Sequence, residues 1–127
     1  MNAHRHNADF LPRAALVALG FAALGRNVLV HASCVLIGCD RISLGDDVRI
    51  DPFCLISAGE PMTIGSYVHI AAGVRLFGAA GLFVGDFAAV SPGAAVFSAS
   101  DDYRAAGLIG PTVPDQFRAV QTAPVRF

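Results

Sequence analysis

The sequence lacks lysine and carries little net charge. All nine of its basic residues are arginines, so no catalytic lysine exists. Ten acidic residues nearly balance them, and the formal net charge of −1 argues against nucleic acid or an anionic membrane surface as a partner. No stretch approaches the ~18 consecutive apolar residues of a membrane span. Asp9, Pro12 and Arg13 precede the first apolar run, unlike the order of a secretory signal. We therefore expect a cytoplasmic protein without a membrane segment.

The pattern that dominates the sequence is a period of 20 residues. An aliphatic residue followed by glycine recurs at 20-residue intervals, and further aliphatic residues follow six and twelve positions later. The three resulting columns are Leu24, Leu44, Ile64 and Val84; Val30, Ile50, Ile70 and Val90; and Leu36, Ile56, Leu76 and Val96. Neither a helix nor a single strand has a six-residue period. The spacing instead predicts a β-solenoid with three short strands per coil.

Stacked coils would give each aliphatic side chain a buried neighbour in the next coil. Burying one such side chain stabilises the fold by roughly 1.5–3 kcal/mol. The glycine after each large residue fits a corner that needs either a positive φ or a close approach of two backbones. Residues 10–19 are predicted to form a short helix, with Pro12 in its first turn and Gly20 at its end. This helix would cover the open edge of the first coil.

The repeat is interrupted after Val96. The next aliphatic start is due at position 104, but Arg104 stands there in a polar segment, and the pattern resumes only at Val125. A long loop on a rigid scaffold is usually functional. We therefore divide the chain into an N-terminal tail and capping helix (1–23), the β-helix coils (24–97), an extended loop (98–124) and the start of a further coil (125–127).

The repeat resembles that of the hexapeptide-repeat acyltransferases over nearly the whole chain. Their fold is an all-β, left-handed parallel β-helix, and members of the galactoside and maltose acetyltransferase type carry an extended loop that reaches the neighbouring subunit of a trimer. A bacterial sugar acetyltransferase branch associated with surface-polysaccharide genes is similar in particular to the segments Val-Arg-Ile-Asp at 48–51, Tyr-Val-His-Ile at 67–70, Gly-Asp-Phe at 85–87, Ser-Asp-Asp-Tyr at 100–103 and Pro-Thr-Val-Pro at 111–114.

This resemblance implies an acetyltransferase that moves acetyl from acetyl-CoA to a sugar or amino-sugar acceptor, either a surface polysaccharide or a nucleotide sugar. It also implies a homotrimer, and an apolar fraction of 54% agrees with buried subunit interfaces. The sequence does not identify the residues that bind acetyl-CoA.

The resemblance places the catalytic base on the extended loop. In the better-known members the base is a histidine, but here Asp101 stands at or near that position and no histidine follows His69. Asp101 is therefore a catalytic candidate, and Asp102 and Tyr103 beside it are candidates for substrate binding. The alternative is that the cluster only shapes the loop, because Asp and Ser favour tight turns.

His69 is the second candidate for the base. It shares an outward column with Arg49, a candidate for substrate binding, at ~4.8 Å strand spacing. A neighbouring cation disfavours protonation of an imidazole, which would leave His69 able to accept a proton. The alternative is a surface imidazole at an interface or bonded to a corner carbonyl. Asp51 and Asp86 also fall at outward positions, where we expect them to hydrogen-bond to loop backbone, and His31 is expected to be a surface residue.

Two other functions are compatible with a solenoid. Relatives continue through further coils that bind the coenzyme, so a truncated or non-catalytic member that acts as an assembly fragment is the alternative, and we expect the 127-residue chain alone to bind acetyl-CoA weakly. A γ-type carbonic anhydrase needs three histidines on zinc, whereas only His31 and His69 lie within the coils. The three cysteines lack metal spacing, and Cys34 and Cys54 fit an inward column as small core residues. We therefore expect no metal.

Overall fold

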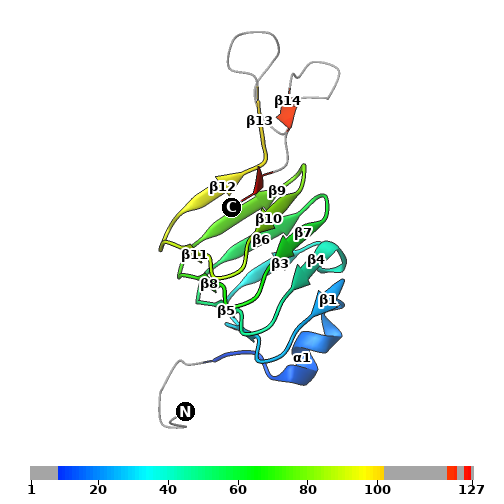
Figure 1. Ribbon diagram of the computed structural model, residues 1–127, viewed down its shortest axis with the longest axis vertical. Helices are drawn as coiled ribbons and strands as arrows, with labels where there is room; N and C mark the ends of the chain where they lie inside the picture. The colour runs from blue at the N-terminus through cyan, green and yellow to red at the C-terminus, as the bar shows by residue number, and fades with distance from the viewer. Residues whose placement is uncertain (1–8, 102–119, 123–124, 127) are drawn as a thin grey trace.

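Three narrow parallel sheets enclose one core and form a β-helix (Figure 1). The computed structural model describes residues 9–101, 120–122 and 125–126. Face 1 contains β1 (Ala23–Leu24), β4 (Ile42–Leu44), β7 (Met62–Ile64), β10 (Leu82–Val84) and β15 (Val125–Arg126). Face 2 contains β2 (Leu29–Val30), β5 (Arg49–Ile50), β8 (His69–Ile70) and β11 (Ala89–Val90). Face 3 contains β3 (Val35–Ile37), β6 (Leu55–Ala58), β9 (Arg75–Gly78) and β12 (Ala95–Phe97).

The strands of successive coils pair in parallel with a register of 20 residues. Leu24 lies opposite Leu44 on face 1, and Arg49 lies opposite His69 on face 2. β15 then joins face 1 beside β10, with Val125 opposite Leu82. The chain therefore returns to the stack after the segment that follows β12.

The aliphatic columns predicted from the sequence form the core. Their central members are buried: Leu44, Ile64 and Val84; Val30, Ile50, Ile70 and Val90; and Ile56 and Leu76. Leu24 and Val96 are only partly buried, because among the described residues each belongs to a strand with a paired neighbour on one side only. Cys54 is buried and Cys34 packs against the same core, as predicted for small inward residues.

The corners between faces 1 and 2 are joined by a ladder of hydrogen bonds from one coil to the next. The backbone N–H of Arg26 donates to Asp46 Oδ1 at 2.8 Å, that of Asp46 to Ser66 Oγ at 3.0 Å, and that of Ser66 to Asp86 Oδ1 at 2.7 Å. Asp86 therefore bonds to loop backbone, as predicted.

The repeated glycine at these corners serves close packing rather than a positive φ. A Cβ on Gly45 would lie 2.7 Å from the carbonyl carbon of Gly65 in the next coil. The positive φ falls two residues after each glycine and is carried by side-chain-bearing residues, Asn27, Asp47, Tyr67 and Phe87. The sequence left both explanations open, and the structure assigns them to different residues.

The N-terminal cover consists of a helix and an added strand-like segment. Helix α1 (Arg13–Ala18) is shorter than predicted and buries Leu16 against the core. Phe10, predicted to begin the helix, instead forms an antiparallel bridge with His31, while the Leu11 N–H donates to the Val30 carbonyl at 2.8 Å. The edge of face 2 is thus paired by residues 9–11. Of the helices described, none has the length and apolarity needed to cross a membrane.

Beyond β12 the chain forms a two-stranded antiparallel pair. β13 (Ala99–Asp101) and β14 (Val120–Thr122) pair with Ala99 opposite Thr122 and Asp101 opposite Val120. Figure 1 shows this pair projecting from the end of the coil stack. The backbone of Asp101 is therefore held in regular structure at the base of this projection.

Candidate functional site

An arginine, an aspartate and a histidine form a hydrogen-bonded cluster on the outer surface of face 2. Arg49 begins β5 and His69 begins β8, so the strand register places them side by side. Asp51 follows β5, and its Oδ1 accepts a hydrogen bond from Arg49 Nε at 2.7 Å, while its Oδ2 lies 2.7 Å from His69 Nε2. The Asp51 side chain is 16% exposed, whereas those of Arg49 and His69 are 56% and 50% exposed. One carboxylate thus fixes two basic side chains that both reach solvent.

The Asp51 carboxyl is held in its ionised form. Burial alone would raise its pKa, but hydrogen bonds from Arg49 and then His69 outweigh burial and lower the pKa of Asp51 below its ordinary value. Because an ionised carboxylate only accepts hydrogen bonds, His69 must carry a hydrogen on Nε2. In the neutral imidazole, Nδ1 is then the atom that can accept a proton.

Two predictions about this cluster are wrong. Within the described part of the chain, the Asp51 side chain bonds to Arg49 and His69 and not to loop backbone. The reason is that Asp51 lies two residues after Arg49 on an extended strand, so both side chains leave the same surface. The Asp51 carboxylate also lies against both basic groups and offsets the repulsion that Arg49 alone would exert on an imidazolium. Arg49 therefore does not keep His69 neutral in the way that the sequence suggested.

Phe10 extends this cluster toward the first coil. Its ring meets the His31 ring edge to face, with centroids 5.5 Å apart, and the Arg49 guanidinium carbon lies 5.4 Å from the Phe10 ring centroid. His31 Nδ1 in turn lies 2.8 Å from Ser33 Oγ. Sequence reasoning missed Phe10 because the pairing of residues 9–11 with β2 lies outside the repeat and leaves no periodic signal.

Asp101 lies in a different part of the chain from this cluster. It ends β13, which leaves the end of β12, where Phe97 pairs with Phe77 of β9. His69 belongs to face 2 and precedes the corner from which β9 starts. The length of face 3 therefore separates the two catalytic candidates within one chain (Figure 1). Asp102 and Tyr103 lie outside the described residues.

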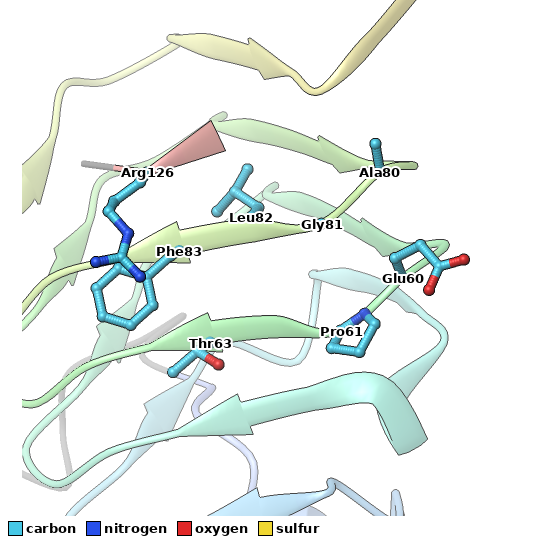
Figure 2. Close-up of a pocket in the computed structure, with 8 residues that line it drawn as sticks. All are labelled: Glu60, Pro61, Thr63, Ala80, Gly81, Leu82, Phe83 and Arg126. Carbon is cyan, nitrogen blue, oxygen red and sulfur yellow. The ribbon is translucent and has the colours of Figure 1, made fainter. Parts of the chain in front are cut away.

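A hollow of about 420 Å³ lies on the opposite side of the molecule, on face 1. Figure 2 shows Arg126 lying over the ring of Phe83 at one end of this hollow and Glu60 at the other. The Arg126 guanidinium carbon is 4.3 Å from the Phe83 ring centroid, a cation–π contact. Thr63, Pro61 and Leu82 complete the walls. None of the site residues predicted from the sequence lines it.

Metal-binding groups were sought among the same residues. Residues 9–101, 120–122 and 125–126 contain no group of three or more His, Cys, Asp or Glu side chains placed to hold a metal ion. The three cysteines are free thiols, and Cys39 lies in a short 3-10 turn (Cys39–Arg41) at a corner.

Comparison with known proteins gave matches among solved structures. A scan against protein-family models and a search of curated proteins found no match. The chain is similar to AntD, an N-acyltransferase from Bacillus cereus. A variant of AntD in complex with dTDP and coenzyme A has a TM-score of 0.90 and 38% identity, over 96% of this chain and 64% of AntD.

Further complexes of AntD match to a similar degree. A variant with dTDP-4-amino-4,6-dideoxyglucose and coenzyme A has a TM-score of 0.88 and 38% identity, over 96% of this chain and 64% of AntD. AntD with dTDP and 3-hydroxybutyryl-CoA has a TM-score of 0.88 and 39% identity, over 93% and 62%. The solved variants change a serine of AntD and an aspartate ten positions further along its chain. This chain spans less than two thirds of the length of AntD.

Proposed function

This chain is a left-handed β-helix of the hexapeptide-repeat acyltransferase type, as the repeat predicted, and from that premise we propose that it transfers an acyl group from a coenzyme A thioester to the amino group of a nucleotide-linked amino sugar. The observation that carries the proposal is the identity with AntD over nearly the whole of this chain, together with the amino-sugar nucleotide and the coenzyme bound to AntD. An amine acceptor narrows the prediction, which included sugar hydroxyls.

The reaction forms one bond and breaks one. The neutral amine nitrogen attacks the thioester carbonyl carbon, a C–N bond forms, and the C–S bond breaks to release coenzyme A as the thiol. The proton lost by the amine balances the proton that the thiolate gains. Because a neutral amine is a good nucleophile, the protein has to orient the amine and accommodate its proton rather than generate a strong base.

We assign the orienting role to Asp101. Ser91 and Asp101 are the one serine and aspartate in this sequence that are separated by ten positions, the spacing of the two residues changed in the AntD variants. A carboxylate can bind the incoming ammonium group and hold it until the proton leaves. Asp102 and Tyr103 follow directly and stay proposed substrate-binding residues, while His69 stays the alternative proton acceptor, with Arg49 beside it.

Two copies of the chain are needed to bring Ser91 and Asp101 together. Ser91 precedes β12 and Asp101 follows it, so the two residues lie at opposite ends of face 3 in one chain. An assembly in which the β13–β14 projection of one copy reaches the Ser91 corner of the next would unite them. The homotrimer expected from the resemblance is such an assembly, and it is part of the proposal.

The test is steady-state acyl transfer to dTDP-4-amino-4,6-dideoxyglucose, with acetyl-CoA and 3-hydroxybutyryl-CoA as donors. Thiol release and product mass are measured, and the two donors decide whether acetyl, the acyl group predicted from the sequence, is accepted. If Asp101 orients the ammonium, Asp101→Asn raises KM for the sugar more than it lowers kcat. If Asp101 is the base, kcat falls by roughly 10²–10⁴ with KM little changed.

Two variants provide the comparison. His69→Gln lowers kcat by a similar factor only if His69 is the proton acceptor. Asp40→Asn removes the same charge from a corner turn and leaves both parameters unchanged. Absence of product with both donors, together with absence of nucleotide-sugar binding, would refute the proposed function.

A further inference from the structure

Two exposed aromatic side chains stack on one another at the corner that leads into face 2. The Tyr67 and Phe87 rings have centroids 5.1 Å apart and are tilted by only 3°. They are 56% and 76% exposed, and both residues have a positive φ, of 57° and 63°. A side chain other than glycine pays a steric cost for this conformation, and neither ring belongs to the core. The pair offers a flat apolar surface, parallel to which a planar ring can stack.

Two basic side chains follow this aromatic pair along the strand direction. His69 comes two residues after Tyr67, about 6.6 Å further on if the backbone is extended. Arg49 lies beside His69 in the preceding coil. Its Nε is occupied by Asp51, and within the described part of the chain no hydrogen bond or ion pair engages its two terminal nitrogens. Those nitrogens and the exposed His69 ring are donors that can meet an anion.

The same direction leads on to Ser91. Phe87, Ala89 and Ser91 belong to the fourth coil, and Ala89 pairs with His69. An aromatic platform, a pair of basic donors and a serine therefore occur in that order across the narrow face 2. In Figure 1, β5, β8 and β11 lie next to one another on one side of the stack.

We propose that this surface binds the nucleoside diphosphate part of the acceptor. The base stacks on Tyr67 and Phe87, the diphosphate meets Arg49 and His69, and the ribose spans the distance between them. The sugar is then directed toward Ser91. The inference rests on the proposed function, because it names the surface on which that nucleotide sugar lies. Coenzyme A also contains a nucleoside diphosphate, so the experiment has to separate the two sources.

The experiment is calorimetric titration of the full 127-residue chain with dTDP and, separately, with coenzyme A. Phe87→Ala should weaken dTDP binding about tenfold or more, since stacking of a base on an aromatic side chain is lost, and Phe87→Tyr should restore it. Arg49→Gln should weaken dTDP binding and also reduce the dependence of the dissociation constant on salt. Phe87→Ala should leave that salt dependence unchanged.

Phe53→Ala is the matched control. Phe53 is 74% exposed and has a φ of 65°, but it lies at the corner between faces 2 and 3, away from the stacked pair. Its removal should leave the affinity for dTDP unaltered, and equal effects of Phe53→Ala and Phe87→Ala would overturn the proposal. Loss of coenzyme A affinity, with dTDP affinity retained, would also overturn it. Wild-type protein that transfers acyl groups while these variants bind dTDP normally would leave the proposed function standing and this inference wrong.

Discussion

Replacement of Asp51 by asparagine tests whether its carboxylate holds Arg49 and His69 together. The substitution keeps the shape of the side chain but removes its charge and turns one acceptor oxygen into a donor. One of the two 2.7 Å contacts then places a donor against a donor. Hydrogen bonds to charged groups contribute about 1.5–3 kcal/mol each, and the half-exposed partners reduce that value through solvent screening. We expect Asp51→Asn to lower the free energy of unfolding by about 1–3 kcal/mol at pH 7.

The pH dependence of this loss follows from the lowered pKa of Asp51. A carboxyl whose pKa is lower in the folded than in the unfolded chain contributes stability above its ordinary value, here 3.8. That contribution disappears as the pH falls through the lower pKa of the folded state. The difference between wild type and Asp51→Asn should therefore be complete at pH 5 and shrink progressively below pH 3.8.

The assay is urea unfolding at several pH values between 2 and 7, followed by circular dichroism. Asp47→Asn serves as the control, because it removes the same charge from a carboxylate with one hydrogen bond from Asn27 at 3.2 Å. Its cost should be within about 0.5 kcal/mol, as for most surface substitutions. Equal costs for the two variants, or an Asp51→Asn cost that persists unchanged at the lowest pH, would contradict the reasoning.

Two further predictions concern the core and the assembly. Ile64→Ala should cost about 2–5 kcal/mol in urea unfolding, because Ile64 lies in the middle of a buried column, while Leu24→Ala at the half-covered end should cost less; equal costs would mean that the column does not define the core. Sedimentation equilibrium at micromolar concentration should give the mass of three 13.2 kDa chains, and a stable folded monomer would remove the proposed trimer.

The sequence predicted what the repeat controls. Leu44, Ile64 and Val84 are buried because a 20-residue period can be satisfied by stacked coils and by no single helix or strand. Asp86 hydrogen-bonds to corner backbone because its place in the coil puts it next to an N–H of the preceding one. Fold class and core thus follow from spacing alone.

The candidate site was predicted less completely, for two physical reasons. Asp51 occupies an outward position from which its carboxylate reaches Arg49 and His69, and spacing does not choose between those partners and backbone. Phe10 reaches Arg49 only because residues 9–11 pair with the edge of face 2, a contact outside the repeat. Arg49 and His69 could be paired from the sequence since the register is part of the period.

The corner ladder of Asp46, Ser66 and Asp86 makes the molecule modular in length. Each side chain in it accepts a hydrogen bond from a residue 20 positions earlier, so every coil meets only its two immediate neighbours. The free energy of such a stack grows nearly linearly with the number of coils, as in a one-dimensional lattice. Insertion of a whole coil preserves the contacts of all others, whereas an insertion within a strand shifts every later column. A corner tolerates any length whose ends return to the same register, as the segment between β12 and β15 does.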